Sequence, residues 1–101
     1  IRPDAEVELQ KVIAALDKYP SLNIKANSHT DSRGPDAYNL WLSQKRAEAT
    51  VNYMISKGIS ADRLQSEGYG ETLLVNNCDD GVRCSNADHE KNRRSEFIIY
   101  E

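Results

Sequence analysis

Two oppositely charged residues, Asp31 and Arg46, stand where they could face a single cleft. Asp31 lies in a polar turn, residues 29–36, that leaves an expected strand and enters an expected helix. Side chains and free N–H groups converge on ligands at such positions. Arg46 follows on that helix, and the pair could bind a zwitterion: the carboxylate accepts from an ammonium, and the guanidinium grips a carboxylate bidentately. The same residues could also form a plain surface salt bridge, which their spacing alone favours because such pairs are common.

The residues His29 and Asp31 also suggest a metal site, because both residue types ligate zinc. A third ligand at helical spacing is missing, since the sequence contains no His-Glu-x-x-His run. A turn in which Asp31 and Thr30 bind nearby backbone N–H groups explains the same residues more simply. We therefore predict no metal at this turn.

The two cysteines of the chain, Cys78 and Cys84, lie close together in a polar stretch, and His89 follows. These three residues could ligate zinc, but the cysteines are further apart than the close pairs of structural zinc sites. A small disulfide-closed loop is the favoured interpretation, and it would stabilise the fold by about 2 kcal/mol on the chain-entropy model. A disulfide would place the protein in an oxidising compartment outside the cytosol, whereas reduced thiols in the cytosol are the remaining alternative.

The sequence offers no arrangement for catalysis. Ser32 and Ser43 lack a partnered histidine and acid. Glu67 and Glu71 could form a carboxylate pair, yet nothing in the sequence marks either as buried. Two arginines at 93–94 are most simply read as a solvated approach to the last strand. We predict a binding domain without enzymatic activity or a cofactor.

Hydrophobic periodicity predicts the elements that must position these residues. The expected helices cover residues 3–19 and 37–57, the expected strands cover 22–27, 64–69 and 94–100, and a long loop covers 70–92. The predicted buried positions are Leu9, Val12, Ile13 and Leu16 in the first helix, and Ala47, Val51, Met54 and Ile55 in the second. Tyr38 and Trp41 could wall a pocket, but aromatic residues at helical spacing more often pack in a core. The order predicts an α+β (two-layer α/β) fold with helices on one face of a small sheet.

Composition narrows the possible functions. The 101 residues make one domain, 1–101, with 39% hydrophobic and 29% charged residues. Thirteen Lys and Arg against sixteen Asp and Glu give a formal charge of −3, which argues against a nucleic-acid binder. No apolar run is long enough to span a bilayer. The chain begins with neither a start methionine nor a signal sequence, so we expect a domain cut from a longer protein.

Several short motifs, taken together and in order, resemble the C-terminal domain family of OmpA. They are Ser28–Gly34 (Ser-His-Thr-Asp-Ser-Arg-Gly), Tyr38-Asn39, Leu42-Ser43-x-x-Arg46-Ala47, Gly58-Ile59, Arg63-Leu64, Gly68-Tyr69-Gly70-Glu71 and Asn92-Arg93-Arg94-x-Glu96-Phe97. Each string alone is weak, but together they cover nearly the whole chain. The family includes the C-terminal domains of OmpA porins, peptidoglycan-associated lipoproteins and flagellar stator subunits.

The resemblance implies non-covalent binding of peptidoglycan. In the family, the residues matching Asp31 and Arg46 hold the diaminopimelate residue of the stem peptide, whose far end carries an ammonium and a carboxylate on one carbon. With this resemblance, a ligand site is favoured over a bare salt bridge. Thr30 and Asn39 match positions that line the family's pocket, and Arg93 matches an arginine at its rim. The implied fold is βαβαββ with a mixed sheet and helices on one face.

The chain departs from the family in three places. The family's first strand, which ends just before the position of Ile1, is expected to be missing, which agrees with an opening helix that no strand precedes. Ser28 stands where many members have glycine. The Cys78–Cys84 loop resembles an insert of a subgroup associated with Bacteroidetes-type envelope proteins, and it suggests a disulfide in the periplasm.

The resulting prediction is a periplasmic domain of an outer-membrane-anchored protein that tethers the membrane to the cell wall through diaminopimelate. The alternative is an envelope assembly module that binds another protein, or itself, through an open sheet edge and has no glycan binding.

Overall fold

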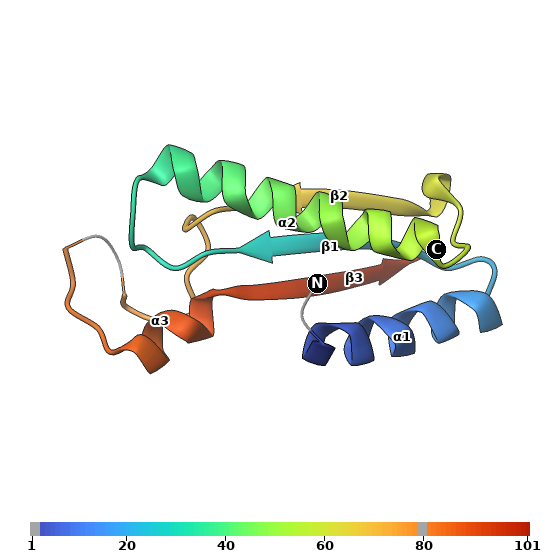
Figure 1. The fold of residues 1–101 in the computed structure, drawn as a ribbon, viewed down its shortest axis with the longest axis horizontal. Coiled ribbons are helices and arrows are strands. Elements are labelled where there is room, and N and C mark those ends of the chain that lie inside the picture. The colour runs from blue at the N-terminus through green and yellow to red at the C-terminus, as the bar shows by residue number, and fades with distance from the viewer. Residues whose placement is uncertain (1–2, 79–80) are drawn as a thin grey trace.

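The computed structural model describes residues 3–78 and 81–101, and it has the expected α+β architecture (Figure 1). A mixed three-stranded sheet carries the chain's helices, as the sequence predicts. Within the described residues, no helix has the length and apolarity needed to cross a membrane. The elements are α1 (Pro3–Lys18), β1 (Asn23–His29), α2 (Asp36–Ser56), a 3₁₀ turn (Ala61–Arg63), β2 (Leu64–Gly68), α3 (Asn86–Asn92) and β3 (Arg94–Tyr100).

The sheet has β1 at its centre, parallel to β2 and antiparallel to β3. In this register, Ser28 of β1 stands opposite Gly68 of β2 and Ser95 of β3. The carboxyl ends of β1 and β2 and the start of β3 therefore meet at one end of the sheet. The loop into α2 and the helix α3 lie at this same end (Figure 1).

The hydrophobic core lies between the helices and one face of the sheet. Ile24 of β1 and Leu64 of β2 are partners in the sheet, and both are buried against Met54 of α2. The α1 stripe completes the cluster through Leu9, Ile13 and Leu16. The helices α1 and α2 thus cover the same face of the sheet. The buried positions predicted for the first helix are confirmed, with Val12 partly buried at the border of the cluster.

The ends of the two long helices also agree with the prediction. Helix α1 ends at Lys18, just before the Tyr19-Pro20 pair, because the residue before a proline is disfavoured in helical conformation. Gly58 follows α2 with a φ of 98°, and Ile59 then turns back into the core with 2% exposure. This is the left-handed glycine stop with its hydrophobic contact.

The second helix faces the sheet differently from the prediction. Ile55 was expected in the core but is 40% exposed, and Tyr38 and Trp41 are more than half exposed. The buried positions of the first turns are instead Asn39 and Ser43. They face inward because that part of α2 packs on a polar loop, whose buried backbone groups need hydrogen-bond partners, rather than on apolar side chains.

The predicted long loop 70–92 contains a helix that the periodicity did not reveal. Helix α3 is only seven residues long and has Ala87 as its single apolar residue, so it has no apolar stripe. Its start is marked by Ser85, whose hydroxyl accepts a hydrogen bond from the Asp88 N–H at 3.1 Å. In the sequence, Ser85 as a helix N-cap was the signal from which α3 could have been predicted.

Candidate functional site

The Asp31 carboxylate lies at the end of the sheet, 8% exposed, and accepts hydrogen bonds from two arginines. Its Oδ1 accepts from the backbone N–H of Arg33 at 2.9 Å. Its Oδ2 accepts from Arg33 Nη2 at 2.8 Å, from Arg33 Nε at 3.3 Å and from Arg93 Nη1 at 2.7 Å. Most of the carboxylate's acceptor capacity is therefore used within the protein.

These contacts fix the charge of Asp31. Burial alone raises the pKa of the carboxyl, but the hydrogen bonds from Arg33 and Arg93 outweigh it and lower the pKa from 3.8 to about 2. Asp31 is therefore ionised at neutral pH. Together with the two guanidinium groups, it gives the cluster a net positive charge.

The buried side chains of Thr30 and Asn39 shape the loop that carries Asp31. The Asn39 amide donates to the carbonyl of Arg33 at 2.9 Å and to that of Asp31 at 3.3 Å. The Thr30 hydroxyl donates to the carbonyl of Asp31 at 3.0 Å, and the Thr30 N–H donates to the Gly70 carbonyl at 2.9 Å. These bonds tie the loop to α2 and to the segment after β2, so the Asp31 side chain is held in place.

Arg46 lies apart from this cluster. It is exposed on α2, and the part of the chain that the structure describes contains no ion pair of its side chain. A plain Asp31–Arg46 salt bridge, the simpler interpretation of their spacing, is therefore not formed. Arg46 stands seven residues after Asn39, so it projects from the same side of α2 roughly 10 Å further along the helix axis. The structure thus brings Thr30, Asp31, Asn39 and Arg93 together. Arg46 is exposed on a neighbouring surface of α2.

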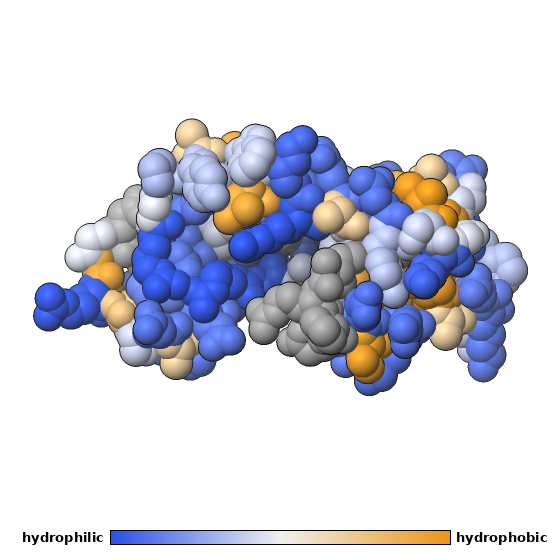
Figure 2. All heavy atoms as spheres, viewed as in Figure 1, coloured by the Kyte–Doolittle hydropathy of each residue, from blue (hydrophilic) through white to orange (hydrophobic). Residues whose placement is uncertain are grey.

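Arg33 is the residue that sequence reasoning missed. It is the main partner of Asp31, and its Nη1 also donates to Asn86 Oδ1 at 3.1 Å, which links the loop to α3. The signal was its position two residues after Asp31 in a tight turn, where a side chain can fold back on the acid. Figure 2 shows hydrophilic residues gathered over this region, between the start of α2 and α3.

His29 lies behind the site, buried in the sheet, and its ring stacks on Tyr69 at 5.2 Å between centroids. Burial lowers the pKa of His29, and the nearby positive charge of Arg94 lowers it further, although Glu96 opposes the shift. The imidazole is therefore neutral at neutral pH. His29 and Asp31 do not belong to any three-residue metal-ligating group among the residues that the structure describes.

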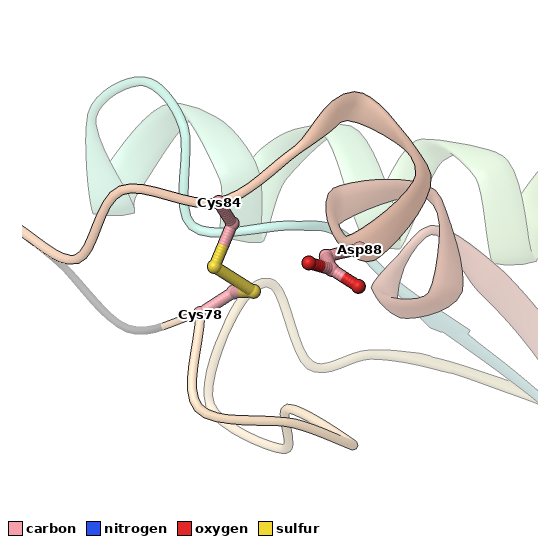
Figure 3. Close-up of side chains that lie close together, drawn as sticks. All are labelled: Cys78, Cys84 and Asp88. Atoms are coloured by element: carbon pink, nitrogen blue, oxygen red, sulfur yellow. A yellow bond between two sulfur atoms is a disulfide. The ribbon is translucent and has the colours of Figure 1, made fainter.

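The cysteines form the favoured disulfide, Cys78–Cys84, with 5.9 Å between their Cα atoms. Asp88 lies beside it, and the three side chains are the single metal-like group within residues 3–78 and 81–101 (Figure 3). Because the two sulfur atoms are bonded to each other, neither is a thiolate that could ligate a metal. The alternative of a zinc site at Cys78, Cys84 and His89 is therefore wrong for this oxidised state.

Comparison with known proteins finds a family that matches most of the chain. The family described as "OmpA family" matches residues 1–88. The chain is 36% identical over 99 residues to the peptidoglycan-associated lipoprotein of Rhizobium meliloti, covering 98% of this chain and 53% of that protein. It thus spans about half the length of this curated relative.

A second relative and a solved structure extend the comparison. The chain is 41% identical over 102 residues to the photosystem I P700 chlorophyll a apoprotein A2 of Gloeobacter violaceus, matching 98% of this chain but 12% of that protein. The structure of the present chain resembles the crystal structure of the peptidoglycan-associated lipoprotein from Burkholderia pseudomallei, with a TM-score of 0.86 and 26% identity. That match covers 99% of this chain and 80% of the other.

Proposed function

The chain belongs to the OmpA family, and from this we propose that it binds peptidoglycan non-covalently. Two of its similar proteins are named peptidoglycan-associated lipoproteins. The site adds chemical support, because it combines the fixed negative charge of Asp31 with the positive charges of Arg33 and Arg93. The proposed role is attachment to the cell wall, without cleavage of it.

The proposed ligand group is the diaminopimelate residue of the stem peptide. The observation that carries this is that the Asp31 carboxylate keeps one acceptor position while the Arg46 guanidinium is exposed. Oδ1 of Asp31 accepts one hydrogen bond among the described residues, which leaves it an acceptor position for an ammonium. Arg46 is exposed with no ion-pair partner in the described ranges, so its guanidinium can take the carboxylate of the same ligand. Thr30, Asn39 and Arg93 hold Asp31 in position and line the approach.

The setting of this activity is proposed to be the periplasm, within a protein anchored in the outer membrane. The Cys78–Cys84 disulfide supports an oxidising compartment. The relative named outer membrane porin F of Pseudomonas fluorescens supports the same envelope location. We also propose that the cystine loop places the chain in the Bacteroidetes-type subgroup of the family.

A sedimentation assay with purified peptidoglycan sacculi tests the proposal. The wild-type domain should sediment with the sacculi, and Arg46→Ala should remain in the supernatant because the carboxylate loses its partner. Lys45→Ala is the matched control, since it removes an exposed positive charge from the adjacent position on α2. Equal loss of binding in both variants would indicate general charge attraction instead of a specific site.

A second candidate function is an assembly module without glycan binding. The observation that favours it is the open edge of β3, where Ile98 and Ile99 are about half exposed on successive positions. Unpaired edge strands add strands from partners. A folded wild-type domain that fails to sediment with sacculi would favour this alternative.

A further inference from the structure

Asn76 is the point at which the segment after β2 is tied to α3. Its side-chain amide donates to the carbonyl of Asp88 at 2.9 Å. Its Oδ1 accepts from the Asn92 side chain at 2.8 Å and from the Cys78 N–H at 3.2 Å. One short side chain therefore holds the middle of α3, the end of α3 and the start of the cystine loop.

The disulfide joins the same two segments covalently. Cys78 follows Asn76 by two residues, and Cys84 immediately precedes Ser85, the N-cap of α3. The bond therefore fixes where α3 begins (Figure 3). Asn76 fixes where α3 ends, through its hydrogen bond with Asn92. Helix α3 needs these ties, because a helix of seven residues is too short to be stable alone.

The end of α3 determines where Arg93 can reach. Asn92 is fully buried, and its Oδ1 accepts from the Val75 N–H at 2.8 Å. Arg93 is the next residue, and its N–H donates to the Glu90 carbonyl at 3.1 Å. Its guanidinium makes one hydrogen-bonded contact within the described part of the chain, to Asp31 Oδ2 at 2.7 Å. The placement of Asn92 thus sets the placement of Arg93 over Asp31.

We propose that Asn76 is a positioning residue for Arg93, with the Cys78–Cys84 disulfide as its covalent counterpart, so that this loop sets the affinity of the Asp31 site. The inference rests on the proposed function for its ligand, the diaminopimelate stem peptide. Loosening the segment that holds Asn76 and the disulfide should leave the sheet and the core intact, since none of its described residues belongs to the main hydrophobic cluster. It releases Arg93 and lets Asp31 move away from the geometry that the ligand requires.

The test compares Asn76→Ala with the Asn77→Ala control, which changes an exposed neighbouring amide. Titration with the tripeptide L-Ala-γ-D-Glu-meso-diaminopimelate, followed by calorimetry, should show about tenfold weaker binding for Asn76→Ala, or about 1.4 kcal/mol. Reduction of the disulfide in the wild-type protein should weaken binding in the same direction. In an Arg93→Gln background, Asn76→Ala should cause no further loss, because Arg93 is the group through which Asn76 acts. An equal loss in that background would overturn the proposal.

A measurement without ligand separates this inference from the proposed function. The titration of the Asp31 carboxyl, followed by NMR in the free protein, reports whether Arg93 is held in place. Its pKa should rise toward the usual range in Asn76→Ala and in the reduced protein, and should stay unchanged in Asn77→Ala. An unchanged pKa in folded Asn76→Ala would overturn the positioning role even if the peptide binds. If Asn76→Ala does not fold, Asn76→Asp, which loses the bond donated to Asp88, is measured in the same way.

Discussion

Replacement of Asp31 by asparagine tests the charge cluster most quantitatively. The substitution keeps the shape of the side chain but removes the charge that Arg33 and Arg93 contact. The folded-state pKa of about 2, against 3.8 for the free carboxyl, corresponds to about 2 kcal/mol of stability at neutral pH. A small domain is stable by roughly 5 to 15 kcal/mol, so Asp31→Asn should remain folded and lose about 2 kcal/mol.

The loss of stability in Asp31→Asn should become smaller as the pH falls. Because folding lowers the pKa of Asp31, its stabilising contribution is complete above the unfolded value of 3.8 and is lost as the pH falls through about 2. The deficit of Asp31→Asn should therefore shrink to about 1 kcal/mol at pH 3. Urea unfolding followed by circular dichroism at pH 7, 5 and 3 measures it, with Glu101→Gln as a control at the exposed chain end. Equal stability of variant and wild type at pH 7, or a deficit that does not shrink in acid, would refute the reasoning.

Three further substitutions test the packing around the site. Gly68→Ala should destabilise the domain by about 3 kcal/mol or more and lower its melting temperature, because the new Cβ would lie 2.2 Å from the backbone nitrogen of Gln44. Ser85→Ala should cost about 1 kcal/mol through loss of the α3 cap, seen as faster amide exchange in residues 86–92, and unchanged exchange would contradict the cap. Met54→Ala should cost about 3 kcal/mol in urea unfolding, because the side chain is fully buried, and a loss below 1 kcal/mol would contradict the assigned core.

The main elements could be predicted because their signals are local. The α1 stripe, the break at Tyr19-Pro20 and the Gly58 stop each depend on neighbouring residues, and the structure confirms them. Helix α3 was not predicted because it lacks an apolar stripe and because its position depends on Asn76 and Cys78, which approach it only in the fold.

The candidate site was predicted only in part, and its role in ligand binding stays a prediction. The motif resemblance named Asp31, Asn39 and Arg93, which the fold brings together, but it also named Arg46, which lies apart. The pairing of Asp31 with Arg33 depends on how one turn folds back on itself, which spacing does not determine. The burial of Asn39 and Ser43 on the inner face of α2 was not predicted, because an apolar stripe is the usual signal for a buried helix face, whereas here the helix packs on polar backbone.

An NMR titration of the isotope-labelled domain with a stem peptide containing meso-diaminopimelate tests the central claim most directly. We predict saturable shifts confined to residues 29–46 and 92–94 in the wild-type domain, and none in a folded Arg46→Ala variant. A folded wild-type domain that shows no shifts, or an Arg46→Ala variant that shifts as the wild type does, would contradict the account.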